Sequence, residues 1–284
     1  MKILSIDTAS NICGVSILED KKLLCQLDDD TGRTHSENLM PMIHKAFEET
    51  KLSLKDINLI VCDKGPGSFT GIRIGVATVK AFADSMGISC IGISSLEALA
   101  YNVKLIPEYG SNYTGLVCSL LDCKNSNCYF ALYQFENGIC NTIIEPSADT
   151  VQNALQHLSG LTETSQIDEI GKMDEISKTD SNNRPILFIG DGVLVYNDII
   201  KQIFPHCLFV QDNANILNSY SLALAGIDRF PCTGNTDVLP LYLRKPQAQR
   251  QLESKLGLKM DINSKMLLQN EVEHKNENFN SSEA

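Results

Sequence analysis

The stretch GPGSFTGIRIG, from Gly65 to Gly75, has the residue types of an anion-binding loop. It follows the apolar run 57–62 and opens a helical pattern that ends near Met86. Free amide N–H groups and the helix dipole converge where a strand, a glycine turn and a helix N-terminus meet, and this arrangement favours a bound phosphate. The stretch is therefore a first candidate for a nucleotide-binding loop.

The spacing within this stretch does not fit either common phosphate loop. The Walker pattern requires Gly, four residues and then Gly-Lys with Ser or Thr, but Ile72-Arg73 stands where the lysine and hydroxyl would be. The dinucleotide pattern GxGxxG fails because three residues separate Gly67 from Gly71, and a proline removes one amide donor. We interpret the loop as a structural turn formed by Gly65, Pro66, Gly67 and Gly71.

The other side chains that could do chemistry are scattered. The five histidines, none of them paired at the i, i+3 or i, i+4 spacing of a helical metal site, are His35, His44, His157, His206 and His274. Ser68, Thr70 and Ser119 lack an evident general base nearby in sequence. Asp7 ends the first predicted strand, but no glycine-bearing phosphate turn follows it. We predict no catalytic residues and no metal site.

The elements that would position these residues occur in two similar blocks. The first block reads as strands 2–7, 12–18 and 22–27, helix 34–51, strand 57–62, helix 72–86, strand 89–92 and helix 94–102. Thr34 and Glu37 have the spacing of a capping box at the first helix, and Pro41 is expected to kink or loosen it. The second block reads as strands 113–122, 128–135 and 138–145, helix 148–158, strand 185–189, helix 193–204, strand 207–210 and helix 214–230.

This repeated order predicts an α/β fold of two lobes. We expect residues 1–105 with 214–246 to form the N-terminal lobe, which carries the partner-docking surface, and residues 106–213 to form the second lobe. The charged stretch 159–184 reads as a surface insertion. Residues 247–284 form a polar tail, which we expect to be partly disordered at its end.

The composition excludes several classes of protein. The net charge of −11 argues against a chain that binds tRNA or DNA by its phosphates without a partner. No apolar run is long enough to span a membrane, and residues 1–7 read as a strand rather than a signal peptide. The ten cysteines form no CxxC pair, which is typical of buried thiols in a cytosolic protein. We expect a cytoplasmic protein without membrane association.

Two helices carry more apolar and small residues than a core face needs. Residues at helical spacing in the second helix form a stripe of mostly small side chains, and Met40 and Met42 lie outside the core stripe of the first helix. Such faces suit either a docking surface or complete burial in a core, and the pattern alone leaves both open. The partner interface that we predict comprises His35, Met40, Met42, Phe69, Arg73, Ile74, Ala77, Thr78, Ala81 and Ser85.

Several stretches together resemble the TsaB family, also called YeaZ. The glycine loop is the most specific of them, and the resemblance is strong over residues 1–105, looser over 113–246 and absent from the tail. Asp122-Cys123-Lys124 stands where the family has Asp-Ala-Arg. The stretches are residues 3–9, 33–41, 65–75, 94–99 and 240–245.

The resemblance implies the two-lobed fold of actin, hexokinase and the chaperone ATPases, a ribonuclease-H-like fold built from two βββαβα-type blocks. It also implies a sister subunit, TsaD, which transfers threonylcarbamoyl to the adenosine beside the tRNA anticodon, and a TsaE-type ATPase in the same complex. TsaD carries a metal-binding HxxxH at the positions that hold Ser95 and Leu99 in this sequence. The family implies a homodimer when TsaD is absent and contact with tRNA only through the complex.

The function expected from the resemblance is that of a non-catalytic scaffold and dimerization subunit supporting TsaD. We expect no cofactor of its own, with any nucleotide confined to the partner interface. The alternative is an enzyme of the same superfamily, either an ATP-dependent transferase or a glycoprotease-like peptidase. The phosphate-loop spacing and the lack of a histidine pair weigh against that alternative.

Overall fold

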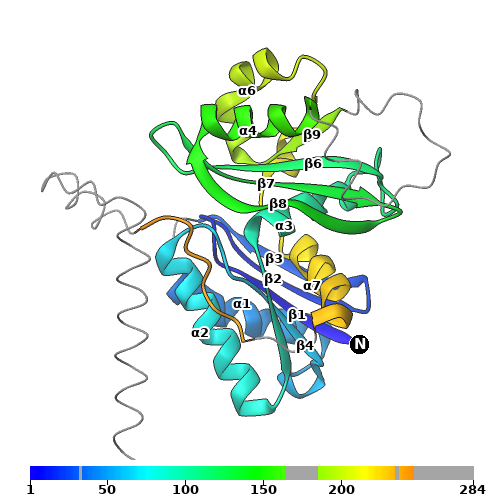
Figure 1. Ribbon diagram of the computed structural model, residues 1–284. Helices are drawn as coiled ribbons and strands as arrows, with labels where there is room; N and C mark the ends of the chain where they lie inside the picture. The colour runs from blue at the N-terminus through cyan, green and yellow to red at the C-terminus, as the bar shows by residue number, and fades with distance from the viewer. Residues whose placement is uncertain (32–33, 164–184, 234–236, 246–284) are drawn as a thin grey trace, which may run out of the picture. The chain divides into compact units, whose positions relative to one another are not determined.

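The computed structural model describes residues 1–31, 34–163, 185–233 and 237–245 (Figure 1). The chain divides into two compact units, 1–243 and 244–284, and all but Arg244 and Lys245 of the second unit lie outside the described residues. The predicted tail 247–284 and most of the predicted insertion 159–184 fall outside them too. None of the described helices is long and apolar enough to cross a membrane.

Residues 1–105 contain the first block of elements. It has three consecutive strands, a helix, a strand, a second helix, a fifth strand and a short third helix. These are β1 (Lys2–Asp7), β2 (Cys13–Glu19), β3 (Lys22–Asp29), α1 (His35–Thr50), β4 (Leu59–Asp63), α2 (Phe69–Met86), β5 (Ser89–Ile93) and α3 (Ser95–Ala100). The 3-10 turns η1 (Leu54–Asp56) and η2 (Tyr101–Leu105) follow α1 and α3.

The second block repeats this order of elements. Its members are β6 (Gly115–Asp122), β7 (Asn127–Glu136), β8 (Ile139–Thr150), α4 (Val151–Glu163), β9 (Ile186–Ile189), α6 (Asp191–Ile203), β10 (Leu208–Phe209), η5 (Asp212–Asn215) and α7 (Ser219–Thr233). Each block forms one five-stranded sheet, in the orders β3-β2-β1-β4-β5 and β8-β7-β6-β9-β10. In both sheets the first three strands are antiparallel and the last two are parallel to the first. The matching orders give the two-lobed α/β fold predicted from the sequence.

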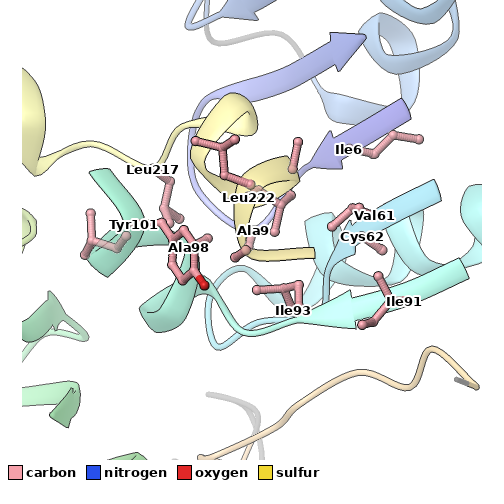
Figure 2. Close-up of a cluster of buried hydrophobic side chains, with 14 of the residues drawn as sticks. Ile6, Ala9, Val61, Cys62, Ile91, Ile93, Ala98, Tyr101, Leu217 and Leu222 are labelled. Carbon is pink, nitrogen blue, oxygen red and sulfur yellow. The ribbon is translucent and has the colours of Figure 1, made fainter. Parts of the chain in front are cut away.

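Helices cover the first sheet on both faces. α1 packs on β2 and β3, α2 packs on β1, β4 and β5, and α7 packs on the opposite face (Figure 1). Strands buried on both faces explain the continuous apolar runs of β1 and β4. Figure 2 shows part of this core, with Ile6, Val61 and Ile91 from the strands and Ala98 and Leu222 from α3 and α7.

The second sheet divides its residues between two cores by strand alternation. Cys118, Leu120 and Leu132 belong to a cluster that packs against α4 and α6. Val117 and Tyr133, which point to the other face, belong to the cluster that includes the first sheet. The period of two along each strand therefore builds two separate cores from one sheet.

Several predicted boundaries were wrong. Residues 148–150, predicted as helix, form the end of β8, so α4 starts at Val151 and runs to Glu163 through the first residues of the predicted insertion. Residues 214–218, predicted as helix, precede α7 because Asn218 accepts hydrogen bonds from the amides of Tyr220 and Ser221 and so caps the helix.

The first helix also differs from its prediction. The predicted capping box does not form, since the Thr34 side chain makes no cap bond and pairs with the Ser36 hydroxyl instead, at 3.1 Å. α1 continues as one helix through Pro41. Seven of the nine described cysteines are buried, as expected for thiols within a core.

Candidate functional site: the strand ends and the α1–α2 surface

Two buried carboxyl groups meet at the ends of the two central strands of the first sheet. β1 and β4 run parallel with Ile6 opposite Cys62, so Asp7 and Asp63 follow at neighbouring positions. The residues are 3% and 0% exposed, respectively. Each carboxyl group influences the pKa of the other. The sequence pattern pointed to Asp7 but not to Asp63, because the two residues become neighbours only when β1 lies beside β4.

One oxygen of each carboxyl group accepts hydrogen bonds from its surroundings. Asp63 Oδ1 accepts hydrogen bonds from the Gly65 amide at 2.7 Å and from Ser95 Oγ at 2.6 Å. Asp7 Oδ1 accepts one from the Ala9 amide at 2.9 Å. The pair therefore joins the ends of β1 and β4 to the glycine loop and to the first turn of α3.

Burial dominates the electrostatics of the pair. Loss of solvent raises the pKa of Asp7 to about 6, against the lowering effects of the Ala9 amide and the Asp63 side chain. Loss of solvent, followed by the charge of Asp7, raises the pKa of Asp63 well above its ordinary value. Burial therefore favours the protonated, neutral form of each carboxyl group.

Ser95 and Leu99, which the resemblance equates with the positions of a metal-binding HxxxH, are both fully buried. Ser95 uses its hydroxyl on Asp63, and Leu99 is apolar. Within the described part of the chain, no group of three or more His, Cys, Asp or Glu residues is arranged to hold a metal ion. The Ser95 hydroxyl thus ties the first turn of α3 to the end of β4.

The glycine loop and α2 pack closely against the turn after β1. A Cβ atom at Gly67 would lie 2.2 Å from the Ala9 carbonyl oxygen, and one at Gly71 would lie 1.9 Å from the Thr8 carbonyl oxygen. The Ser68 amide donates to the Ala9 carbonyl at 2.7 Å, and Thr8 Oγ1 donates to the Gly71 carbonyl at 2.8 Å. The glycines thus allow backbone contact between α2 and the strand end, with no side chain between them.

The predicted interface residues occupy three kinds of position. Exposed side chains on the outer faces of α1 and α2 are those of Met40, Arg73, Ala77, Ala81 and Ser85. Half-buried side chains are those of His35, Met42, Phe69, Ile74 and Thr78. Met42 and Ile74 pack partly against the core, and His35 Nε2 bonds the Ser10 carbonyl at 2.7 Å. We call the exposed and half-buried outer side of α1 and α2 the α1–α2 surface.

An apolar groove adds residues to this surface that the sequence pattern did not single out. The groove has a volume of about 550 Å³, and its lining is mostly apolar. The side chains that make it apolar are Met40, Ile43, Phe47, Leu52, Leu54 and Phe82. Phe47 and Phe82 are not among the predicted interface residues. Phe47 follows Met40 by seven residues, which is two helical turns, and Phe82 directly follows Ala81. These two large rings next to predicted interface residues are the sequence signal that could have identified the groove.

The segment 237–243, which we call the C-terminal strap, runs along α2. The Tyr242 ring stacks on Phe69 with centroids 4.8 Å apart, and its hydroxyl accepts a hydrogen bond from Arg73 Nε at 2.8 Å. Lys80 pairs with Asp237 at 2.7 Å, and the Leu241 amide donates to the Lys64 carbonyl at 2.7 Å. Two predicted interface residues, Phe69 and Arg73, therefore hold the strap against α2.

The fold and the strand-end site together define a class of protein. Two sheets with the same strand order, each beginning with a three-stranded antiparallel meander, are the architecture of the actin and hexokinase class. The solved structure of YeaZ from Pseudomonas aeruginosa is similar, with a TM-score of 0.65, 18% identity, and coverage of 85% of this chain and 99% of that one. At this identity the likeness bears on the fold.

Sequence comparisons narrow the class to a family. The family model described as "TsaD: tRNA N6-adenosine threonylcarbamoyltransferase" matches residues 29–250. The TsaB protein of Escherichia coli (strain K12) is 31% identical over 166 residues, which are 56% of this chain and 68% of that protein. The TsaB protein of Bacillus subtilis (strain 168) is 28% identical over 203 residues, 72% of this chain and 76% of that protein. The chain belongs to the TsaD family and, within it, to the TsaB proteins.

Proposed function

We propose that the chain is a non-catalytic subunit that supports TsaD in forming threonylcarbamoyladenosine in tRNA, and that it binds TsaD through the α1–α2 surface. The family match carries the assignment to this pathway, since both bacterial relatives are named as tRNA threonylcarbamoyladenosine biosynthesis proteins. The same surface forms a homodimer when TsaD is absent. A TsaE-type ATPase joins the complex, which works in the cytoplasm.

The chemistry of the strand-end site supports a non-catalytic role. The positions of the sister subunit's histidines hold a serine that bonds Asp63 and a buried leucine. The amide of Ser68 in the glycine loop is occupied by the Ala9 carbonyl. The chain therefore has no cofactor of its own in this proposal, and a nucleotide binds only where the partner completes the site.

The exposure of α2 supports the choice of surface. Ala77, Ala81 and Ser85 are small and exposed, so a partner helix can approach the α2 backbone closely. The adjoining groove, with Phe47 and Phe82, offers apolar area next to this flat face. A contiguous apolar groove beside small residues is typical of a protein–protein contact. The net charge of −11 supports contact with tRNA through the complex rather than by this chain alone.

The direct test is reconstitution with purified TsaD, a TsaE-type ATPase, tRNA and threonylcarbamoyl adenylate. We expect the modified nucleoside, measured by mass spectrometry after tRNA digestion, to form with this chain and to fall strongly without it. The chain alone should bind no stoichiometric zinc or iron and should hydrolyse neither ATP nor peptide. Modification independent of the chain, or ATP or peptide hydrolysis by the purified chain, would instead support the enzyme alternative.

A further inference from the structure

The hydrogen bonds of the buried carboxyl pair leave one buried oxygen of Asp63 without a partner. Asp63 Oδ1 is occupied by the Gly65 amide and the Ser95 hydroxyl. Asp63 Oδ2 is inaccessible to solvent and accepts no hydrogen bond from a described residue, and the Asp7 carboxyl lies at the end of the adjacent strand. Two ionised carboxylates buried side by side would repel each other, and neither would have a proton to donate to the other. One of the two must therefore carry a proton.

The surroundings decide which of the two carboxyls is the acid. Asp7 accepts a backbone amide and lies near the imidazole of His35, and both favour its charged form. Asp63 is the more deeply buried residue and lies beside the charge of Asp7. A proton on Asp63 Oδ2 that points to Asp7 satisfies both groups and leaves one negative charge at the site.

We infer that Asp7 and Asp63 share a single proton, held on Asp63, and that this acid–carboxylate hydrogen bond locks the ends of β1 and β4 to the glycine loop that starts α2. The proton neutralises one of the two negative charges, so the two carboxyl groups can lie together in the core without a metal ion. The pair also affects the position of α2. It accepts hydrogen bonds from the amides of Gly65 and Ala9, and these residues adjoin the backbone contacts of that helix. This inference stands apart from the proposed function.

The other titratable groups that face the pair come from four elements. Asp28 of β3 raises the pKa of Asp7, and His35 of α1 lowers it. Burial raises the thiol pKa of both Cys13 of β2 and Cys62 of β4, so these neighbours stay neutral near pH 7. From the glycine loop and α3, the groups in contact with the pair are a backbone amide and the Ser95 hydroxyl, which do not titrate in this range.

The inference predicts a direction for the dependence of stability on pH. Both carboxyls have a folded-state pKa above the unfolded value, so the folded state binds more protons than the unfolded state as pH rises above about 4. The stabilisation is complete below the unfolded pKa and is lost as pH rises through the folded pKa values. Above pH 6, where Asp7 is ionised, the further loss reports on the Asp63 proton.

The test compares the full chain with the Asp63→Asn variant by urea unfolding from pH 6 to pH 9. The asparagine amide can donate to Asp7 while its oxygen keeps the Gly65 and Ser95 bonds, so the variant should fold and should lose this part of the pH dependence. The unfolding equilibrium constant of the wild type should rise relative to that of the variant by up to about tenfold per pH unit. Asp7→Asn should be less well tolerated, since its amide must face either the Ala9 amide or the Asp63 proton.

Infrared spectroscopy observes the proton itself. At pH 7.5 the wild type should show the carbonyl stretch of a buried protonated carboxylic acid, and Asp63→Asn should lack it. Asp198→Asn, which removes an exposed carboxylate of α6, is the matched control and should retain both the band and the pH dependence. A wild type without the band, or unfolding curves of wild type and Asp63→Asn that shift equally with pH, would overturn the inference. If Asp63→Asn does not fold, the wild-type band and its persistence in Asp198→Asn decide the question.

Discussion

The Tyr242 ring stacks on the Phe69 ring with 16° between the ring planes, although 173 residues separate the two in sequence. The contact closes the C-terminal strap over the first turn of α2. Arg73 reinforces it, since its guanidinium lies 5.6 Å from the Tyr242 ring centroid. The last described part of the chain is thereby fixed to the helix that we propose as the docking element.

A double-mutant cycle measures this contact. Phe69→Leu and Tyr242→Leu should each reduce the free energy of unfolding, and their coupling energy should be about 0.5–1.5 kcal/mol, as is typical of stacked aromatic pairs. Urea denaturation of the four proteins provides the values. Phe69→Leu combined with Tyr220→Leu, a distant tyrosine that bonds the Lys21 carbonyl, is the control and should be additive. A coupling energy of zero for the first pair would mean that the strap leaves α2 in solution.

Gly71→Ala tests the close packing between α2 and the end of β1. The new Cβ would lie 1.9 Å from the Thr8 carbonyl oxygen, and backbone cannot move aside as a side chain can. We expect a loss of about 3 kcal/mol in the free energy of unfolding, at the upper end for overpacking. Gly160→Ala in α4, where the added Cβ meets no atom within 4 Å, is the matched control and should gain about 0.5–1 kcal/mol. Equal stability of the two variants would contradict this packing.

Arg229→Met tests the ion pair that joins α7 to α3. Arg229 Nε lies 2.6 Å from Glu97 Oε1, and burial raises the pKa of Glu97 while the Arg229 charge opposes that rise. Without the arginine the folded-state pKa of Glu97 rises further. The variant should therefore be about as stable as the wild type near pH 4 and should lose stability relative to it as pH rises through the raised pKa of Glu97. At pH 8 its free energy of unfolding should be about 3 kcal/mol lower than that of the wild type.

Two further variants separate charge from packing at this ion pair. Adding Glu97→Gln to Arg229→Met should restore much of the lost stability at pH 8, because it removes the buried uncompensated charge. Lys21→Met, which removes the exposed lysine that pairs with the half-buried Asp228, should change stability by less than about 1 kcal/mol. A deficit in Arg229→Met that does not vary between pH 5 and pH 8 would contradict the electrostatic account.

The architecture was predictable because it depends on local patterns. Apolar runs such as 57–62 and 113–122 identify strands buried on both faces, and their repeated order predicts two sheets. The start of α7 was missed although Asn218 and Ser219 are good cap residues, because the apolar periodicity extends in front of the cap. The end of β8 was missed because its last residues are polar and partly exposed and pair with β7 only in the folded sheet.

The contacts between distant segments were not predictable. Asp7 and Asp63 become neighbours only when β4 inserts beside β1, and the sequence gives no sign of which strand does so. Phe69 and Arg73 were predicted as residues of the partner interface, but their contact with Tyr242 depends on the path of the chain after α7. Helical spacing placed Ala77 and Ala81 in one stripe but left open whether the stripe is buried or exposed, and the structure shows both side chains exposed.

The central claim, that the chain supports TsaD through the α1–α2 surface, is tested most directly by Ala81→Arg. Ala81 is exposed, so the variant should melt within about 0.5 kcal/mol of the wild type by circular dichroism. A desolvated unpaired charge costs several kcal/mol, so TsaD binding in size-exclusion chromatography, the homodimer and tRNA modification in the reconstituted complex should all fall strongly. Gln152→Arg on the exposed side of α4 is the control and should retain all three. An Ala81→Arg protein that folds, binds TsaD and supports modification like the wild type would contradict the account.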